Sequence, residues 1–232
     1  RDAQESRGLG DVYKRQAPPE RVIYLVDRPG AAQSVIVVSL PGPPRATPHY
    51  AALEVFNAAF GGQFVSRLNL NLREDKGYTY GARSHFSYLR HAGEFLITAP
   101  VETAVTAAAL REIVSELETV TGARPLTAEE VAYAAASLAN GYLRTLETPA
   151  QVARALAELA LHGLGDDALE RFPHEAAAVT AAQLAHLAPA VIHPAAAVIA
   201  IVGDRAAIET DLSALNLGPL VHVHPAALTE LP

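Results

Sequence analysis

Apolar residues in the first half of the chain form short runs rich in β-branched side chains. Residues 21–27 (RVIYLVD) and 34–40 (SVIVVSL) are two such runs, with a Pro-Gly turn between them. Runs of this length and composition predict strands, and the Pro-Gly pair predicts the loop that joins them. Farther along, residues 78–88 and 94–99 flank a second glycine-containing turn, which predicts an antiparallel hairpin.

In the second half, apolar residues recur at intervals of three and four, which is the period of an amphipathic helix. Thr127 and Thr148 have the N-cap chemistry for two such helices. The second of these is expected to bury an apolar stripe made of Val152, Leu156 and Leu159. A late buried strand is predicted at 197–202. Strands, then helices, then a strand predict an α+β fold, in which a mostly antiparallel sheet of about six strands has helices packed on one face.

The most distinctive stretch is residues 57–84, NAAFGGQFVSRLNLNLREDKGYTYGARS. Gly61 and Gly62 break an apolar helical run, either as a helix end that leads into a tight link or as a flexible loop. A short amphipathic helix is predicted from Phe64 to Arg73, because apolar residues recur every four positions, at Phe64, Leu68 and Leu72. Arg73 would end this helix, where a cation suits the dipole.

The predicted strand follows the helix through Gly77, where a positive φ is expected. Alternation along the strand would place Tyr78 and Tyr80 on one face of the sheet. An arginine and a tyrosine presented together can hold a peptide carbonyl or a developing oxyanion. The alternative is that Arg73 is an ordinary helix-end charge and Tyr80 an ordinary packing residue.

Length and composition bound the function. The 232 residues suffice for one large core, and we assign residues 21–232 to a single domain. Residues 1–20 are polar and non-periodic at first, and we expect a tail there. The net charge of -7 offers no basic surface for nucleic acid. The absence of cysteine excludes disulfides and thiolate metal sites. The sequence contains no run of about 18 uncharged apolar residues, so we expect no membrane span.

A zinc site is not expected in this chain. An H-x-x-E-H motif would place two histidines on one helix face, but it is absent. His91 comes nearest, since Glu94 follows at the right spacing, but Phe95 stands where the second histidine belongs. His222 and His224 have no third ligand close in sequence and fit a solvated terminal strand better. Arg67, with Glu74 and Asp75, is expected to form a solvated cluster at the helix end.

The central stretch resembles the C-terminal, non-zinc half-domain of the M16 metallopeptidases, the family of insulinase, pitrilysin and the mitochondrial processing peptidases. The matching residues are Gly61-Gly62, Ser66-Arg67-Leu68, Leu72-Arg73-Glu74, Lys76-Gly77-Tyr78-Thr79-Tyr80 and Ser84. The resemblance extends over roughly residues 20 to 225 and implies the fold of an M16 half-domain. It also implies that the chain has no cofactor of its own, with zinc in the partner half.

The resemblance implies a role for each matching site residue. Arg73 and Tyr80 would contact the substrate backbone and stabilise the tetrahedral intermediate at a zinc site carried by another half-domain or subunit. Substrate binding would also involve Gly61, Gly62, Tyr78 and Ser84. The implied partners are a zinc-bearing M16 half and an extended peptide substrate. A structural subunit resembling the core subunits of respiratory complexes remains open, as does a peptide-binding module without chemistry. A bacterial source is expected, with the periplasm preferred over the cytoplasm.

Overall fold

The computed structural model describes residues 20–224, so the predicted tail lies outside the described residues except for Glu20. One six-stranded sheet runs through this part of the chain. Its strands are β1 (Val22–Asp27), β2 (Gln33–Gly42), β3 (Arg83–Tyr88), β4 (Gly93–Glu102), β5 (Val198–Gly203) and β6 (Leu220–Val223). Their order across the sheet is β3-β4-β2-β5-β1-β6.

The sheet is mostly antiparallel, as predicted. β3 pairs with β4, β4 with β2, and β2 with β5, all antiparallel. β1 is parallel to both β5 and β6. The hairpin β3-β4 is therefore local, whereas β5 returns from the far end of the chain to lie between β1 and β2.

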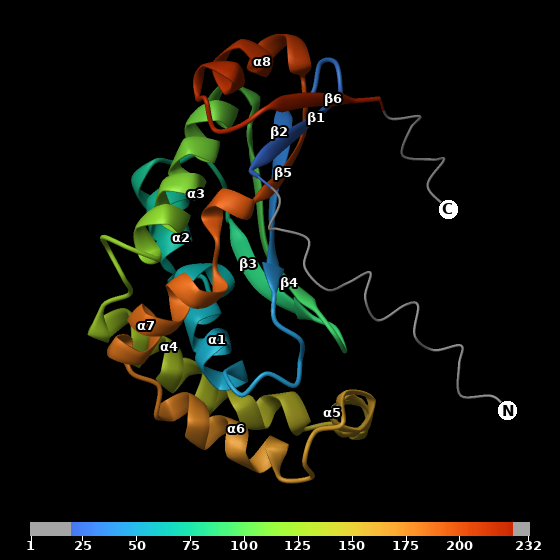
Figure 1. Cartoon of the computed structure of the whole chain (residues 1–232), viewed down its shortest axis with the longest axis vertical. Coiled ribbons are helices and arrows are strands. Elements are labelled where there is room, and N and C mark those ends of the chain that lie inside the picture. Colours follow the sequence, from blue (N-terminus) through green and yellow to red (C-terminus); the bar gives the residue numbers. More distant parts are fainter. Residues whose placement is uncertain (1–19, 225–232) are drawn as a thin grey trace, which may run out of the picture.

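The helical layer lies on one side of the sheet (Figure 1). Its α-helices are α1 (Tyr50–Asn57), α2 (Arg67–Asn69), α3 (Thr106–Val120), α4 (Ala128–Gly141), α5 (Pro149–His162), α6 (Ala168–Ala177), α7 (Ala181–Val191) and α8 (Arg205–Ala214). Two π-helical turns extend α1 and α2, namely η1 (Ala58–Gly62) and η2 (Leu70–Asp75). Short 3-10 turns are η3 (Thr103–Val105), η4 (Tyr142–Leu146) and η5 (Pro194–Ala196).

The core fills the space between the sheet and the helices. Its centre is an aromatic cluster in which Phe56 and Phe60 from the first helix stack at 5.6 Å and Phe86 meets Phe95 of the hairpin at 4.6 Å. Aromatic rings at these separations stabilise a core beyond the area that they bury. The first helix is thereby fixed against β3 and β4, the two strands that follow the central stretch.

The predicted helix starts are confirmed at two threonines. Thr127 and Thr148 each cap a helix through a reciprocal capping box, and Gly163 ends α5 with φ 63°. One part of the α5 prediction is wrong: Val152 and Leu156 are exposed, and only Leu159 is buried. α5 stands apart from the sheet at one end of the helical layer, so only part of its apolar stripe meets the core (Figure 1).

Within residues 20–224, no single helix is long and apolar enough to cross a membrane. Two consecutive helical segments, α6 and Ala181–Ala196, together have the length and composition of a membrane span, but the chain bends by 112° between them.

Candidate functional site

The helix that carries Arg73 is made of α2 and η2 and is called the site helix below. The sequence predicted that it begins at Phe64, but in the structure it begins at Arg67. Ser66 is still extended, with φ -132° and ψ 159°, and the helical turns α2 and η2 follow it. Leu68 and Leu72 are fully buried, but Phe64 precedes the helix and is 67% exposed. The apolar stripe therefore has two members, and Phe64 is free for another contact.

Arg67 is not part of a solvated cluster, which corrects the sequence interpretation. Its side chain is only 8% exposed and donates to both carboxylate oxygens of Glu130, at 2.8 and 2.6 Å. It also donates to the backbone carbonyls of Arg124 and Pro125, at 2.6 and 3.0 Å. Burial alone would raise the pKa of Glu130, but hydrogen bonds from Arg67 and Thr127 outweigh burial and hold that pKa below its usual value. The start of the site helix is thus clamped to the N-terminus of α4.

Arg73 lies in the last turn of η2, as the sequence predicted. Its guanidinium stacks over the ring of Phe64, with 4.0 Å between the guanidinium carbon and the ring centroid. One terminal nitrogen, Nη1, lies 3.1 Å from the carboxylate of Glu74. That nitrogen is buried and has no hydrogen-bond acceptor in the described part of the chain, because the Glu74 contact lacks hydrogen-bond geometry. The side chain is therefore oriented but has a donor to spare.

The predicted strand at 78–88 begins only at Arg83, so Tyr78 and Tyr80 do not lie on a sheet face. Gly77 turns the chain with φ 65°, as predicted. The Thr79 hydroxyl then donates to the carbonyl of Pro100 at 2.5 Å, and Asn69 accepts from the backbone N–H of Ala82 at 2.8 Å. These bonds take the place of strand pairing and fix the segment between the helix and the hairpin.

Tyr78 and Tyr80 differ in their surroundings. The backbone N–H of Tyr78 donates to the carbonyl of Leu72 at 2.8 Å, and its partly buried ring packs against the core. Tyr80 is 92% exposed, the highest value among the exposed large apolar or aromatic residues of the described chain. The fixed segment therefore presents one aromatic ring, with its hydroxyl, to the surroundings.

Gly61 and Gly62 close the first helix inside the turn η1. A Cβ on Gly61 would lie 2.6 Å from the Ser84 hydroxyl oxygen, and one on Gly62 would lie 2.6 Å from the side-chain nitrogen of Asn57. Ser84 is 3% exposed and donates to the side-chain oxygen of Asn57 at 2.7 Å. Gly61 allows a close approach between the helix and β3, and Gly62 leaves room for Asn57 of the same helix. The helix-end alternative therefore describes the two glycines better than a flexible loop. A substrate contact of these three residues stays a prediction.

Metal ligands do not gather in residues 20–224: no group of three or more His, Asp or Glu side chains has the spacing to hold an ion. His222 pairs with Glu209 at 2.7 Å on the edge strand β6. His91 lies in the turn between β3 and β4.

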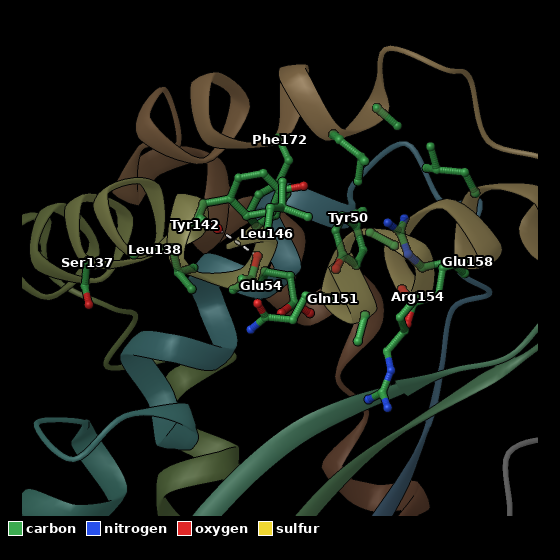
Figure 2. Close-up of a pocket in the computed structure, with 18 residues that line it drawn as sticks. Tyr50, Glu54, Ser137, Leu138, Tyr142, Leu146, Gln151, Arg154, Glu158 and Phe172 are labelled. Carbon is green, nitrogen blue, oxygen red and sulfur yellow. Dashed lines mark hydrogen bonds between the residues drawn. The ribbon is translucent and has the colours of Figure 1, made fainter. Parts of the chain in front are cut away.

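A cavity that no sequence motif indicates lies elsewhere in the fold. It has a volume of about 630 Å³, is open to solvent on one side, and is lined by residues of α1, α4, η4, α5 and α6 (Figure 2). None of the six predicted site residues lines it. Its lining comes from residues that are far apart in sequence, Tyr50 and Phe172 for example, so no local motif marks it.

The chain was compared with protein families and with curated protein sequences. A family model described as the peptidase M16 inactive domain matches residues 9–138. This match includes the site helix, the segment with Tyr80 and the hairpin. No curated protein sequence matches the chain.

Solved structures share the fold. The chain is similar to a peptidase M16 inactive domain from Pseudomonas fluorescens, with 24% identity and a TM-score of 0.75, covering 82% of this chain and 45% of that one. It is similar to a protease from Helicobacter pylori at 19% identity and TM-score 0.72, covering 82% and 46%. A chain of complex III2 from Candida albicans, solved with Inz-5 bound, has 13% identity and TM-score 0.68, covering 84% and 49%. This chain thus spans less than half the length of each.

Proposed function

Because this chain belongs to the peptidase M16 inactive-domain family, we propose that it is the substrate-binding, non-zinc half of a zinc metallopeptidase. A second half-domain, in the same polypeptide or in a partner subunit, carries the zinc motif. This half holds an extended peptide, and Arg73 and Tyr80 donate hydrogen bonds to the peptide carbonyl whose oxygen becomes negatively charged during cleavage.

One observation carries the proposal, namely the exposure of Tyr80 on a fixed segment. A ring that is 92% exposed gains nothing from packing within this chain. The backbone around it is nevertheless held by the hydroxyl of Thr79 and the side chain of Asn69. A side chain that is presented by a rigid frame and left free at its tip suits contact with a ligand better than it suits stability.

Arg73 supports the same role through its spare donor. The stack on Phe64 restricts the guanidinium without using its N–H groups, because a cation–π contact involves the flat face of the group. Nη1 is buried beside Glu74, but the side chain as a whole is 31% exposed. The other N–H groups of the guanidinium are therefore the donors that an oxygen atom of a bound peptide would reach.

The sheet offers a place for the peptide backbone. β3 is at one end of the strand order and pairs with β4 on its inner side. An extended peptide can add to such an edge through main-chain hydrogen bonds. Since Tyr80 precedes the first residue of β3 by three positions, a peptide on this edge passes close to the exposed tyrosine.

A second candidate is a structural subunit without peptidase chemistry. It is favoured by the similarity to a chain of complex III2, which has the same fold within a large assembly. The two candidates differ in what Tyr80 and Arg73 do. Both side chains are needed for turnover in the first, and neither is needed for assembly in the second.

Complementation tests the proposal. The chain is mixed with the protein that carries H-x-x-E-H and is encoded upstream or next to it, and cleavage of a mixed library of quenched fluorescent peptides is followed. We expect neither component alone to cleave the peptides, and the mixture to cleave them in a chelator-sensitive way. A stable complex that cleaves nothing, and that gains nothing from added zinc, would support the structural subunit.

A further inference from the structure

The cavity between the helices has features that the proposed peptidase function does not use. Figure 2 shows side chains from α1, η4, α5 and α6 directed toward a common space. The space of about 630 Å³ is large enough for a side chain or a small molecule. Its most unusual member is a carboxylate, Glu54, on the middle of α1.

Glu54 is half-buried, and few groups compensate its charge. Burial raises its pKa, although a hydrogen bond from Tyr88 and the charge of Arg45 act against this. The Tyr88 hydroxyl donates to one carboxylate oxygen at 2.9 Å. Among the described residues no Lys, Arg or His forms an ion pair with Glu54 within 4.0 Å. Arg45 also lines the cavity, but it stacks on Tyr50, with its guanidinium carbon 3.5 Å from the ring centroid, and forms no ion pair with Glu54.

Aromatic rings form the walls around this carboxylate. Phe172 lies 5.5 Å from Tyr50 and 4.9 Å from Tyr142, measured between ring centroids. These three rings come from three separate helical elements, α1, η4 and α6. The electron-rich faces of such rings attract cations, and their apolar area accommodates an alkyl chain.

The charges at the rim do not favour an anion. Arg154 and Glu158 both line the cavity from α5, one turn apart, and carry opposite charges. Their effects on a guest partly cancel, and both are exposed, so solvent screens them. Arg45 is the remaining cation in the lining, but its charge has a smaller effect on the pKa of Glu54 than burial or the Tyr88 hydrogen bond. The half-buried carboxylate of Glu54, which has no ion pair, therefore decides the preference.

We propose that this cavity binds the side chain of a lysine or arginine residue from a peptide, with the cationic group at Glu54 and the alkyl stem between Tyr50, Tyr142 and Phe172. The site is separate from Arg73 and Tyr80 and does not depend on peptidase activity. An ammonium or guanidinium supplies the hydrogen bonds and the positive charge that the carboxylate lacks.

The test uses three capped amino acids as probes: N-acetyl-lysine methylamide, the corresponding arginine compound and the norleucine compound. Binding to the whole chain is followed by titration of amide chemical shifts. We expect both cationic probes to shift signals from α1, η4 and α6, and norleucine, which has a similar alkyl chain without charge, to bind at least about tenfold more weakly. Equal binding of all three would overturn the proposal, and so would no binding of the cationic probes at about 10 mM, a concentration at which even a millimolar site is mostly filled.

Variants locate the site. Glu54→Gln keeps the shape of the side chain and should weaken the binding of both cationic probes about tenfold or more, with little effect on the binding of the norleucine probe. Glu170→Gln is the matched control, because Glu170 is exposed on α6 and does not line the cavity. Tyr142→Leu removes one ring but keeps apolar area, and should weaken the cationic probes about two- to tenfold. If Glu54→Gln and Tyr142→Leu both bind the cationic probes as tightly as wild type, the cavity is not the site. The same conclusion follows if Glu170→Gln loses as much affinity for these probes as Glu54→Gln does.

Discussion

Replacing Arg67 by methionine should destabilise the whole domain, although the residue was predicted to lie in a solvated cluster. Methionine fills most of the volume but removes four hydrogen bonds, two to Glu130 and two to backbone carbonyls. Removing one partner of a buried ion pair typically costs about 3–5 kcal/mol. Glu130 is 27% exposed and still accepts from the Thr127 N–H at 2.7 Å, so solvent and the capping box recover part of that cost.

We therefore expect the free energy of unfolding to fall by roughly 2–4 kcal/mol and the Tm by roughly 5–15 °C. Glu130→Gln is the matched change, because glutamine at this position can still complete the capping box. Urea unfolding of wild type, both single variants and the double variant gives the coupling energy between the two side chains, which should exceed about 1 kcal/mol.

The cost should also depend on pH. Since the pKa of Glu130 is lowered in the folded chain, its stabilising contribution is present above its unfolded pKa and disappears as the pH falls through the folded value. The penalty of Arg67→Met should shrink accordingly in acid. A Tm change below about 2 °C, or effects of Arg67→Met and Glu130→Gln that simply add, would refute the clamp.

Three further predictions follow from the described contacts. Gly61→Ala should lower the free energy of unfolding by about 1–3 kcal/mol, because the new Cβ meets buried Ser84 and Leu68, whereas Gly141→Ala, with open space around it, should cost nothing. Burial raises the pKa of Glu54 in the folded state, so Glu54→Gln should match wild type at about pH 4 and become more stable than it as the pH rises above the ordinary pKa of glutamate, until the folded carboxyl has itself ionised. Metal analysis of the chelator-washed chain should detect no tightly bound zinc, and one zinc per chain would contradict the assignment as the non-zinc half.

Local chemistry made parts of this fold predictable from sequence. The β-branched runs predicted strands, and the capping boxes at Thr127 and Thr148 predicted helix starts within a residue or two. Gly77 was expected at positive φ because a helix had to end and a new segment to begin there, and its φ of 65° confirms this. In each case the determining interaction lies within a few residues along the chain.

Long-range contacts account for the errors. Phe64 fits the helical period but lies outside the helix, where it stacks on Arg73. Tyr78 to Ala82 alternates like a strand, yet Thr79 and Asn69 hold the segment through Pro100 and the backbone of Ala82. Periodicity contains no information about such partners. The same holds for the cavity, whose aromatic walls meet only when α1 packs against η4 and α6, which follow much later in the chain.

The site residues Arg73 and Tyr80 were chosen through resemblance to a family, and their geometry shows what physical reasoning adds. Sequence alternation suggested that Tyr80 lies in a sheet, where packing would explain it. The structure instead leaves it 92% exposed on a fixed segment. This exposure removes the packing explanation, and the functional explanation can be tested by removing the Tyr80 hydroxyl alone.

That test is the measurement of kcat/KM for Tyr80→Phe and Arg73→Ala in the presence of the zinc-bearing half, together with Tm. Tyr133→Phe is the matched control, because Tyr133 is 54% exposed on α4, outside the candidate site. Removing one donor to a developing oxyanion should lower the rate by about 10²–10³ at unchanged Tm, while the control stays within about twofold of wild type. If Tyr80→Phe and Arg73→Ala both keep activity within about threefold, which is less than 1 kcal/mol of transition-state stabilisation, the two side chains do not take part in catalysis.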